Sequence, residues 1–273
     1  VERLTGNAAS CPMLGASQTM SYRNRAQFKS DGVTLGYVAK GTHEIVDVTR
    51  CPVLNVTNQG HMSALRQSLP NNVWHPNKNR QWITIDIDDE RGTPLVNQRQ
   101  AFRQGNTEQN EQLRAWLSSR LANLSRPSAV FELFCGSGNL TEVIVERVDV
   151  PIIAIEGDEM SLDALSALNL SNVQAARVNL FSQHSIRDNM PESQPGIGVV
   201  LDPPREGLKE REAMKSWFTN AEWVVYVSCD LGTWERDTIF LQSCGLDLDE
   251  ATGLDMFPQT PHIETLSVFT RRA

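Results

Sequence analysis

Several common features are scarce or missing in this sequence, and each absence narrows the class of protein. The five cysteines are dispersed, odd in number and form no CxxC pair, and the five histidines show no metal-ligand spacing. We therefore expect neither a disulfide framework nor a metal site, and the cysteine usage is typical of the cytoplasm. No apolar run could cross a bilayer, and no apolar segment follows a basic N-terminus, so no membrane partner is predicted.

Basic residues are also fewer than acidic residues. The chain has 25 Lys and Arg against 33 Asp and Glu, a net charge of −8, and this average alone argues against a nucleic acid partner. The average hides a division, because residues 1–126 hold 15 basic against 10 acidic residues, and residues 127–273 hold 10 against 23. The net charge is therefore +5 for residues 1–126 and −13 for residues 127–273. The N-terminal part suits contact with phosphates, and the alternative interpretation is a solvated charged surface.

Sequence patterns divide the chain into two regions. Residues 20–98 contain short strand-like segments and one helical segment, at 22–29, 35–40, 81–87 and 53–68. We predict a small α+β domain over residues 1–98 and a larger domain over residues 99–273, a division that 273 residues allow. The chain begins at Val1 rather than at a methionine, so the sequence leaves open whether a further segment precedes Val1.

The larger region alternates strands with helices. A helix is predicted from Asn106 and Thr107 to Pro127, with leucines and a tryptophan at helical spacing. Apolar segments typical of strands follow at 129–134, 151–155, 173–178, 198–201, 223–228 and 264–270. Short apolar strands separated by helices predict a parallel α/β sheet covered on both faces. Ligands of such sheets bind beyond the carboxyl ends of the strands.

The first two strand ends favour a nucleoside ligand. Gly136 and Gly138 follow the first strand and allow a tight turn with close backbone approach to a ligand. Thr141 replaces the third glycine of a dinucleotide fingerprint, which weakens a hydride-transfer site. Glu156 ends the second strand, 20 residues after Gly136, where an acid suits a ribose diol. A plain tight turn and a solvated acid are the alternatives.

Four further strand boundaries carry candidate functional groups. Asn179 ends the third strand and suits adenine recognition or, equally well, turn capping. Asp202 ends the fourth and is held by two prolines, which favours a substrate contact over a simple turn. Cys229 ends the fifth, where a following helix N-terminus favours the thiolate, although a buried apolar role is commoner for cysteine. Glu264 begins the last strand.

Motifs along nearly the whole chain resemble the RNA uridine-5-methyltransferase family. The segments from the first strand of the larger region onward are ELFCGSGNLT, IEGDE, LDPPREG, YVSCD and DMFPQTPHIE. Those nearer the N-terminus are SYRNRAQFK, GYVAKGTHEIVDVTRCPVL and AFRQGNTEQ. The order DPPR, SC, HIE is highly specific, although no single motif is. The resemblance implies a Rossmann-like class I methyltransferase sheet with an antiparallel last strand. It also implies S-adenosylmethionine as cofactor and 5-methyluridine in ribosomal RNA or tRNA as product.

The resemblance implies three catalytic residues. Cys229 resembles the nucleophile that adds to carbon 6 of uracil and so turns carbon 5 into an enolate carbon. Glu264 resembles the base that removes the carbon-5 proton. Asp202 resembles the residue that hydrogen-bonds and polarises the ring.

Cofactor and substrate contacts are predicted at other positions. The cofactor set is Gln104, Phe134, Gly136, Gly138, Glu156, Asn179 and Asp202. For the substrate, the resemblance implies base stacking by Phe102 and a contact from Arg205. Alternation along residues 22–29 places Arg23 and Arg25 on one strand face, where phosphates would lie.

The sequence departs from the family pattern at two places. Asp230 and Leu231 replace the usual Asn-Pro after Cys229, and an acid there is expected to raise the pKa of the nucleophile. Some relatives hold an iron–sulfur cluster on four cysteines, and only Cys51 matches one of these positions. A cluster is therefore not expected in this chain, and an N-terminal RNA-binding barrel is also missing. Either both were lost, or both lie upstream of Val1.

Two other functions compete with uridine methylation. A methyltransferase of another RNA base is disfavoured, because the Asn-Pro-Pro-aromatic and Pro-Cys motifs of the adenine-N6 and cytosine-5 enzymes are missing. A non-catalytic RNA-binding or folding paralogue would lack Cys229 or Glu264, and both are present. We therefore predict a monomeric cytoplasmic enzyme, with ribosomal RNA favoured because residues 36–54 resemble that branch of the family.

Overall fold

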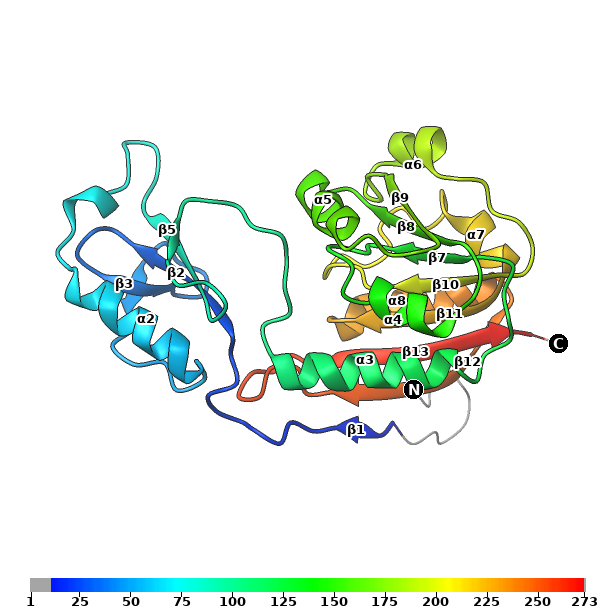
Figure 1. Ribbon diagram of the computed structural model, residues 1–273, viewed down its shortest axis with the longest axis horizontal. Coiled ribbons are helices and arrows are strands. Elements are labelled where there is room, and N and C mark those ends of the chain that lie inside the picture. Colours follow the sequence, from blue (N-terminus) through cyan, green and yellow to red (C-terminus); the bar gives the residue numbers. More distant parts are fainter. Residues whose placement is uncertain (1–10, 273) are drawn as a thin grey trace. The chain divides into compact units, whose positions relative to one another are not determined.

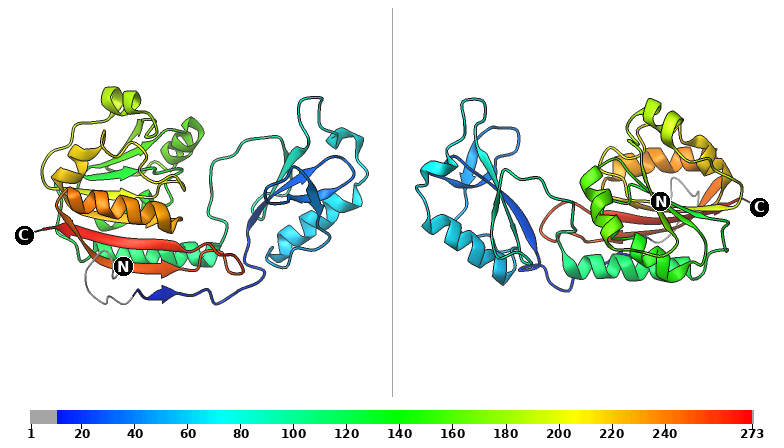
Figure 2. Two further views of the ribbon diagram at one scale, coloured as in Figure 1. Left: turned by 180° about the vertical axis from the view of Figure 1, so that it is seen from behind. Right: turned by 45° about the horizontal axis from the view of Figure 1, so that its top comes forward.

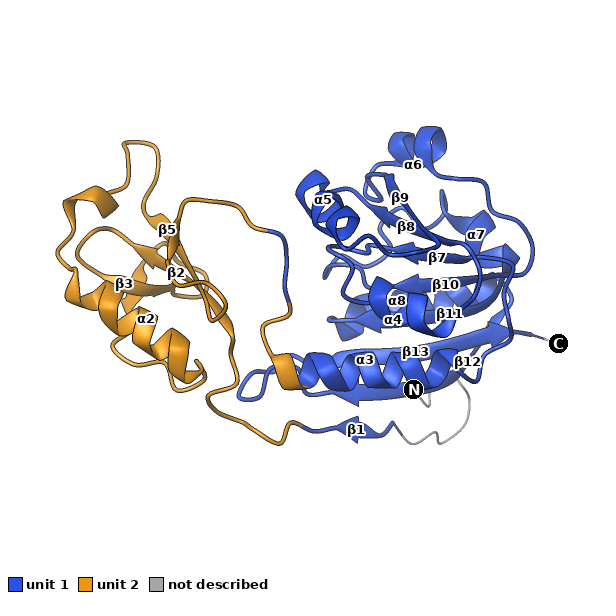
Figure 3. Ribbon diagram, in the orientation of Figure 1, with its two compact units in different colours: residues 1–15, 101–103, 109–273 blue, residues 16–100, 104–108 orange. Residues whose placement is uncertain are grey.

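The computed structural model describes residues 11–272 (Figure 1). These residues form two compact units (Figure 3), of which the larger comprises 11–15, 101–103 and 109–272 and the smaller comprises 16–100 and 104–108. Residues 11–15, which the sequence patterns grouped with the small domain, thus pack with the larger unit. None of the described helices has the length and apolar character needed to cross a membrane.

The larger unit is built on one eight-stranded sheet. Its strand order is β1-β12-β13-β11-β10-β7-β8-β9. The bounds are Met13–Leu14 (β1), Leu246–Leu254 (β12), Glu264–Arg271 (β13), Ala221–Ser228 (β11), Ile197–Leu201 (β10), Val130–Leu133 (β7), Ile152–Glu156 (β8) and Val173–Arg177 (β9). The five strands from β11 to β9 are parallel, and β13 is antiparallel to both of its neighbours. The predicted antiparallel last strand is therefore confirmed.

Helices cover both faces of this sheet (Figure 1). One face packs against α3 (Thr107–Leu121), α4 (Thr141–Arg147) and α5 (Glu159–Ala167), and the other against α6 (Gln183–Asn189), α7 (Lys215–Asn220) and α8 (Leu231–Ser243). The strands contribute to both cores by alternation: Val130 faces α3 and α4, and Phe131 faces α7 and α8. Near-continuous apolar strands are what this two-sided burial requires.

Three elements of the larger unit differ from the sequence prediction, of which the first is the two-residue strand β1, which was not predicted. Strand β12, which lies beside β13 in both views of Figure 2, was not predicted. Its segment LDLDEATGL carries three acids and a register shift near Glu250, which obscure the apolar alternation. Helix α3 ends at Leu121, earlier than the predicted stop at Pro127.

The smaller unit is an α+β module, as predicted. Its antiparallel sheet has the order β4-β3-β2-β5-β6. The bounds are Ile45–Asp47 (β4), Leu35–Val38 (β3), Arg25–Ser30 (β2), Ile83–Asp88 (β5) and Leu95–Val96 (β6), with α2 over Val56–Gln67 and a 3-10 turn over Asn72–Trp74. Phe28 and Ile85 from the sheet share one core with Met62 of α2. The side chain of Asn55 caps α2 by accepting from the Asn58 amide.

Candidate active site

Strand pairing brings Cys229 and Glu264 to the same edge of the large sheet. Ser228 of β11 pairs with Thr265 of the antiparallel β13, so Cys229 and Glu264 each lie one residue past this pair on the same side. Val227 and Leu266 belong to the apolar core on the α3 face, and neighbouring residues of a strand point to opposite faces. The same alternation places Cys229 (two after Val227) and Glu264 (two before Leu266) on the α3 side.

Asp202 joins them from the next strand, β10. It follows Leu201, and its amide donates to the carbonyl of Leu133 at 3.4 Å. Val200 packs in the core on the α3 face, so the two-residue period directs Asp202 to that face as well. The predicted catalytic residues thus lie at the ends of three adjacent strands, β10, β11 and β13. They lie at the same end of the sheet and on the same face of it.

Burial controls the protonation of the two carboxyl groups. Glu264 is 9% exposed, and burial raises its pKa to about 7 against the opposing charge of Arg205. Burial, followed by the charge of Glu264, raises the pKa of Asp202 to about 8. Both groups therefore exchange protons near neutral pH, which is typical of catalytic acids and bases.

The surroundings of Cys229 do not favour the thiolate, contrary to the expectation from the helix N-terminus. Burial first, and then the charges of Glu264 and Asp202, raise the pKa of Cys229 to about 11, while Arg205 opposes the shift. The negative charge that raises the pKa of Cys229 thus comes from Glu264 and Asp202, and not from the adjacent Asp230 as predicted. The Asp230 carboxylate instead caps α8, accepting from the Thr233 amide at 2.9 Å.

The turn after β7 leaves open space at the carboxyl edge. Gly136 has a φ of +54°, and a Cβ added there would meet no atom within 4 Å. Gly138, at φ +97°, packs closely against Leu165 and Leu168, which leave no room for a side chain. Phe134 also has a positive φ, +64°, and its ring lies 5.6 Å from that of Phe181. Backbone strain in a non-glycine residue often marks a functional site.

Glu156 and Asn179 stand beside this turn. The carboxylate of Glu156 accepts the amides of Gly136 at 3.2 Å, Gly157 at 2.7 Å and Asp158 at 2.9 Å. A carboxylate has about four acceptor positions, so one remains for a ligand hydroxyl. The amide oxygen of Asn179 accepts from the Phe181 amide at 3.0 Å, which is the turn-capping role, and its NH₂ group is available for a ligand.

The other predicted residues are more dispersed. Phe102 is 66% exposed, and its carbonyl accepts from the Ser137 hydroxyl at 3.3 Å. Gln104 belongs to the smaller unit, so its cofactor contact stays a prediction. Arg25 is paired with the buried Asp86 at 3.2 Å. Arg23 lies outside β2 in an isolated bridge, so alternation along one strand does not relate it to Arg25.

Glu132 and His262 lie near the site within the quoted motifs, but neither was predicted to be a site residue. Glu132 is 2% exposed, and burial together with Asp202 raises its pKa to about 8. An acid inside an apolar strand was the available signal. His262 contacts Arg205, whose Nη2 lies 3.2 Å from Nε2 and 3.3 Å from Nδ1 of the imidazole.

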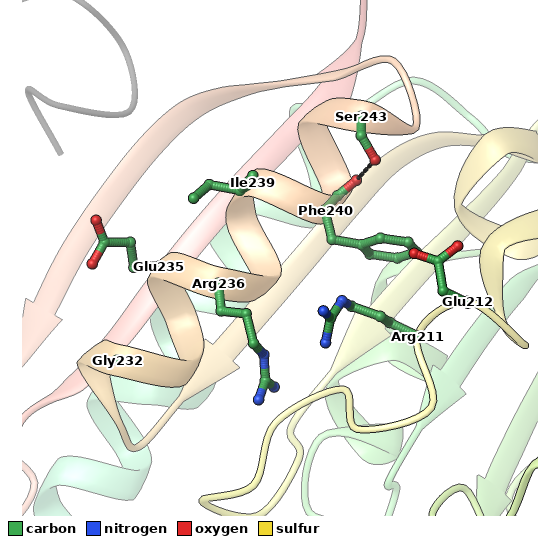
Figure 4. Close-up of a pocket in the computed structure, with 8 residues that line it drawn as sticks. All are labelled: Arg211, Glu212, Gly232, Glu235, Arg236, Ile239, Phe240 and Ser243. Carbon is green, nitrogen blue, oxygen red and sulfur yellow. Dashed lines mark hydrogen bonds between the residues drawn. The ribbon is translucent and has the colours of Figure 1, made fainter.

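A surface hollow lies apart from these groups, between α8 and the segment that precedes α7 (Figure 4). Arg211 and Arg236 line it together with Glu212 and Glu235, so its charge is balanced. None of the predicted site residues contributes to it. Within residues 11–272, no group of three or more His, Cys, Asp or Glu is arranged to hold a metal ion.

A parallel sheet with one antiparallel strand near its edge and a glycine turn after β7 defines the class I methyltransferase fold. The crystal structure of Pyrococcus abyssi tRNA (uracil-54, C5)-methyltransferase in complex with S-adenosyl-L-homocysteine superposes with a TM-score of 0.72 at 18% identity, covering 98% of this chain and 80% of that one. The sequence model of the tRNA (uracil-5-)-methyltransferase family matches residues 84–272. The chain belongs to this family.

Curated relatives extend the comparison. An uncharacterised RNA methyltransferase of Nitrosomonas europaea is 39% identical over 256 residues, which cover 92% of this chain and 64% of the relative. The 23S rRNA (uracil(1939)-C(5))-methyltransferase of Psychromonas ingrahamii is 34% identical over 178 residues, covering 62% of this chain and 38% of that protein. The chain thus spans about four tenths to two thirds of the length of these relatives.

Proposed function

We propose that this protein transfers a methyl group from S-adenosylmethionine to carbon 5 of a uridine in RNA. The observation that carries the proposal is the placement of Cys229, Glu264 and Asp202 on one side of one sheet edge. A nucleophile, a base and a hydrogen-bonding acid are the groups that methylation of uracil at carbon 5 requires. Membership of the family supports the same activity.

The turn after β7 fits S-adenosylmethionine. The space beside Gly136 admits a ligand, and Glu156 keeps one acceptor position for a ribose hydroxyl. The NH₂ group of Asn179 has no partner among the described residues and is available to adenine. Phe134 and Phe181 offer partly buried rings beside it. The cofactor supplies an electrophilic methyl group when it is bound.

Covalent catalysis by Cys229 overcomes the low nucleophilicity of carbon 5. Addition of the Cys229 thiolate to carbon 6 forms a carbon–sulfur bond and moves electrons through carbon 5 to the carbonyl oxygen at carbon 4. The enolate carbon would then take the methyl group of the sulfonium, whose sulfur–methyl bond breaks to leave a neutral thioether. The Glu264 carboxylate next removes the proton from carbon 5. The carbon–sulfur bond then breaks, the double bond between carbons 5 and 6 reforms, and the thiolate is released.

The raised pKa of Asp202 suits it to stabilise the enolate. With a pKa of about 8, Asp202 holds its proton at pH 7 and donates a hydrogen bond to the carbonyl oxygen where negative charge develops. Glu264, with a pKa of about 7, has a substantial carboxylate fraction at the same pH. The neighbouring acids thus serve as a donor and a base.

We assign RNA contact to the smaller unit and catalysis to the larger. The smaller unit holds 10 basic against 8 acidic residues, a net of +2, so most of the +5 of residues 1–126 lies outside it. Its exposed Lys40, Arg50, Lys78 and Arg80 form no ion pair within the described residues, and we expect them to contact phosphates. The 23S rRNA specificity named for several relatives favours ribosomal RNA, and a monomer in the cytoplasm stays a prediction.

The decisive experiment traps the covalent intermediate. RNA containing 5-fluorouridine should form a stable adduct with the protein in the presence of S-adenosylmethionine, because fluorine at carbon 5 cannot leave as a proton. A denaturing gel detects the adduct, and peptide mass spectrometry locates it. Cys229→Ala should form none, and the Cys244→Ala variant of a buried cysteine on the opposite face is the matched control. An adduct in Cys229→Ala, or none with the wild type on either ribosomal RNA or tRNA, contradicts the proposal.

A further inference from the structure

The surroundings of Cys229 raise a chemical problem. The nucleophile must lose a proton, yet burial and two carboxyl groups, Glu264 and Asp202, oppose this loss. The cation acting on Cys229 is Arg205, and the same charge favours the carboxylate of Glu264. Arg205 remains charged at every physiological pH, so the position of its guanidinium affects the pKa of both groups against the larger effect of burial.

The loop after β10 that carries Arg205 (residues 202–207, the Arg205 loop) has its backbone held by contacts that do not involve the Arg205 side chain. The Gly207 amide donates to the Pro204 carbonyl at 2.8 Å, and Arg236 of α8 donates to the Glu206 carbonyl at 2.9 Å. The side chain itself is long and exposed, and fixing such a chain costs conformational entropy. A separate contact is therefore needed to keep the guanidinium near the reacting groups.

His262 provides that contact. Nη2 of Arg205 lies within 3.3 Å of both imidazole nitrogens. A guanidinium has no acceptor, so Arg205 donates, and a neutral imidazole accepts through the one nitrogen that carries no proton. His262 lies two residues before Glu264 on the segment that leads into β13, which ties the position of Arg205 to the strand that carries the base.

We propose that His262 is a positioning residue that holds the Arg205 guanidinium against the segment leading into Glu264, so that its charge supports the Glu264 carboxylate and the Cys229 thiolate. The inference rests on the proposed function, because it concerns the same site. Arg205, which was predicted to contact the substrate, thereby also acts on Cys229 and Glu264.

Alkylation of Cys229 tests this role without RNA or cofactor. Iodoacetamide reacts with the thiolate, so below the pKa the rate at fixed pH follows the thiolate fraction. Mass spectrometry of the Cys229 peptide between pH 7 and 10 gives this rate apart from those of the other cysteines. Arg205→Ala should lower it about tenfold, the effect of one pKa unit from a nearby cation. His262→Ala should lower it several-fold, and His262→Gln, which keeps an acceptor, should restore most of it.

A second histidine–arginine pair supplies the control. Nδ1 of His184 lies 2.6 Å from Nη2 of Arg187 on α6, and His184→Ala should leave the Cys229 rate unchanged. Thermal unfolding followed by circular dichroism confirms that each variant is folded. An unchanged rate in folded His262→Ala overturns the inference, as does a Gln variant as slow as the Ala variant. Failure of the 5-fluorouridine trap with this alkylation pattern intact would instead overturn the proposed function.

Discussion

Glu264 and Asp202 are two acids whose shared buried environment raises the pKa of both, and the proposed function gives them different roles. Burial raises both pKa values, to about 7 and about 8, and the charge of Glu264 adds to the shift of Asp202. Both carboxyl groups thus have pKa values near neutral pH, which suits the base and the hydrogen-bond donor that the proposed reaction needs. Glu132 extends this group of buried acids behind the site.

Substitution of the base should separate methylation from release. Glu264→Gln should methylate RNA but accumulate the Cys229-linked product, with turnover reduced about 10²- to 10⁴-fold, the usual contribution of a general base. In the wild type, the release rate should rise with pH through about 7, because the carboxylate is the active form and protonation below this pH removes it. Rapid quenching followed by a denaturing gel at pH 6 and 8 measures both effects.

The exposed Glu222 of β11 offers the comparison for this experiment. Glu222→Gln should turn over at the wild-type rate, because its carboxyl is remote from the catalytic edge. Full turnover by Glu264→Gln would mean that another group removes the carbon-5 proton.

Among the structural elements, α8 connects the Arg205 loop to the sheet through one buried acid. Asp237 of α8 accepts from the Leu208 amide at 2.8 Å, from the Tyr226 hydroxyl at 2.9 Å and from Nε of Arg236 at 2.9 Å. Gly207 approaches the same carboxylate so closely that a Cβ would lie 2.3 Å from its oxygen. The geometry after Asp202 thus depends on a residue 35 positions away in the chain.

Removal of this acid should destabilise the larger unit. Asp237→Ala leaves three buried or partly buried donors without an acceptor, and loss of one partner from a buried charged network costs about 3–5 kcal/mol. The exposed Asp188 of α6 pairs with Arg187, and Asp188→Ala should cost less than about 1 kcal/mol. Urea unfolding followed by tryptophan fluorescence measures both. Equal stability of the two variants would contradict the anchoring role of Asp237.

At the scale of the whole molecule, charge is divided between the two units. The smaller unit has a net charge of +2, and residues 127–273 have −13. The proposed contact with phosphates therefore assigns binding to a few exposed cations of the smaller unit rather than to a broad basic surface. Arg25, paired with Asp86, is a weaker candidate for this contact than the sequence suggested.

Charge reversal in the smaller unit should weaken RNA binding. Lys78→Glu combined with Arg80→Glu should lower affinity and reduce the slope of log Kd against log salt by about 0.7 for each lost phosphate contact with single-stranded RNA. Arg177→Glu combined with Arg187→Glu, at exposed positions of the larger unit, is the matched control and should leave the slope unchanged. Fluorescence anisotropy with labelled RNA measures the slope. Equal slopes in both double variants would remove these residues from the RNA interface.

The sequence by itself determined the alternation of strands and helices, the glycine turn and the motif order that ends in Cys229 and Glu264. Such features depend on near neighbours along the chain, so periodicity and turn chemistry reveal them. Strand β12 escaped because its acids hide the alternation, and its place is set by pairing with β13.

Only the tertiary structure decided which groups surround the candidate site residues. Pairing of β11 with β13 joins Cys229 to Glu264 across 35 residues, burial moves their pKa values, and Asp86 engages Arg25. Contacts of this kind join distant parts of the chain, and the desolvation that shifts a pKa depends on everything packed around the group. Local sequence patterns therefore predict neither the long-range contacts nor the desolvation.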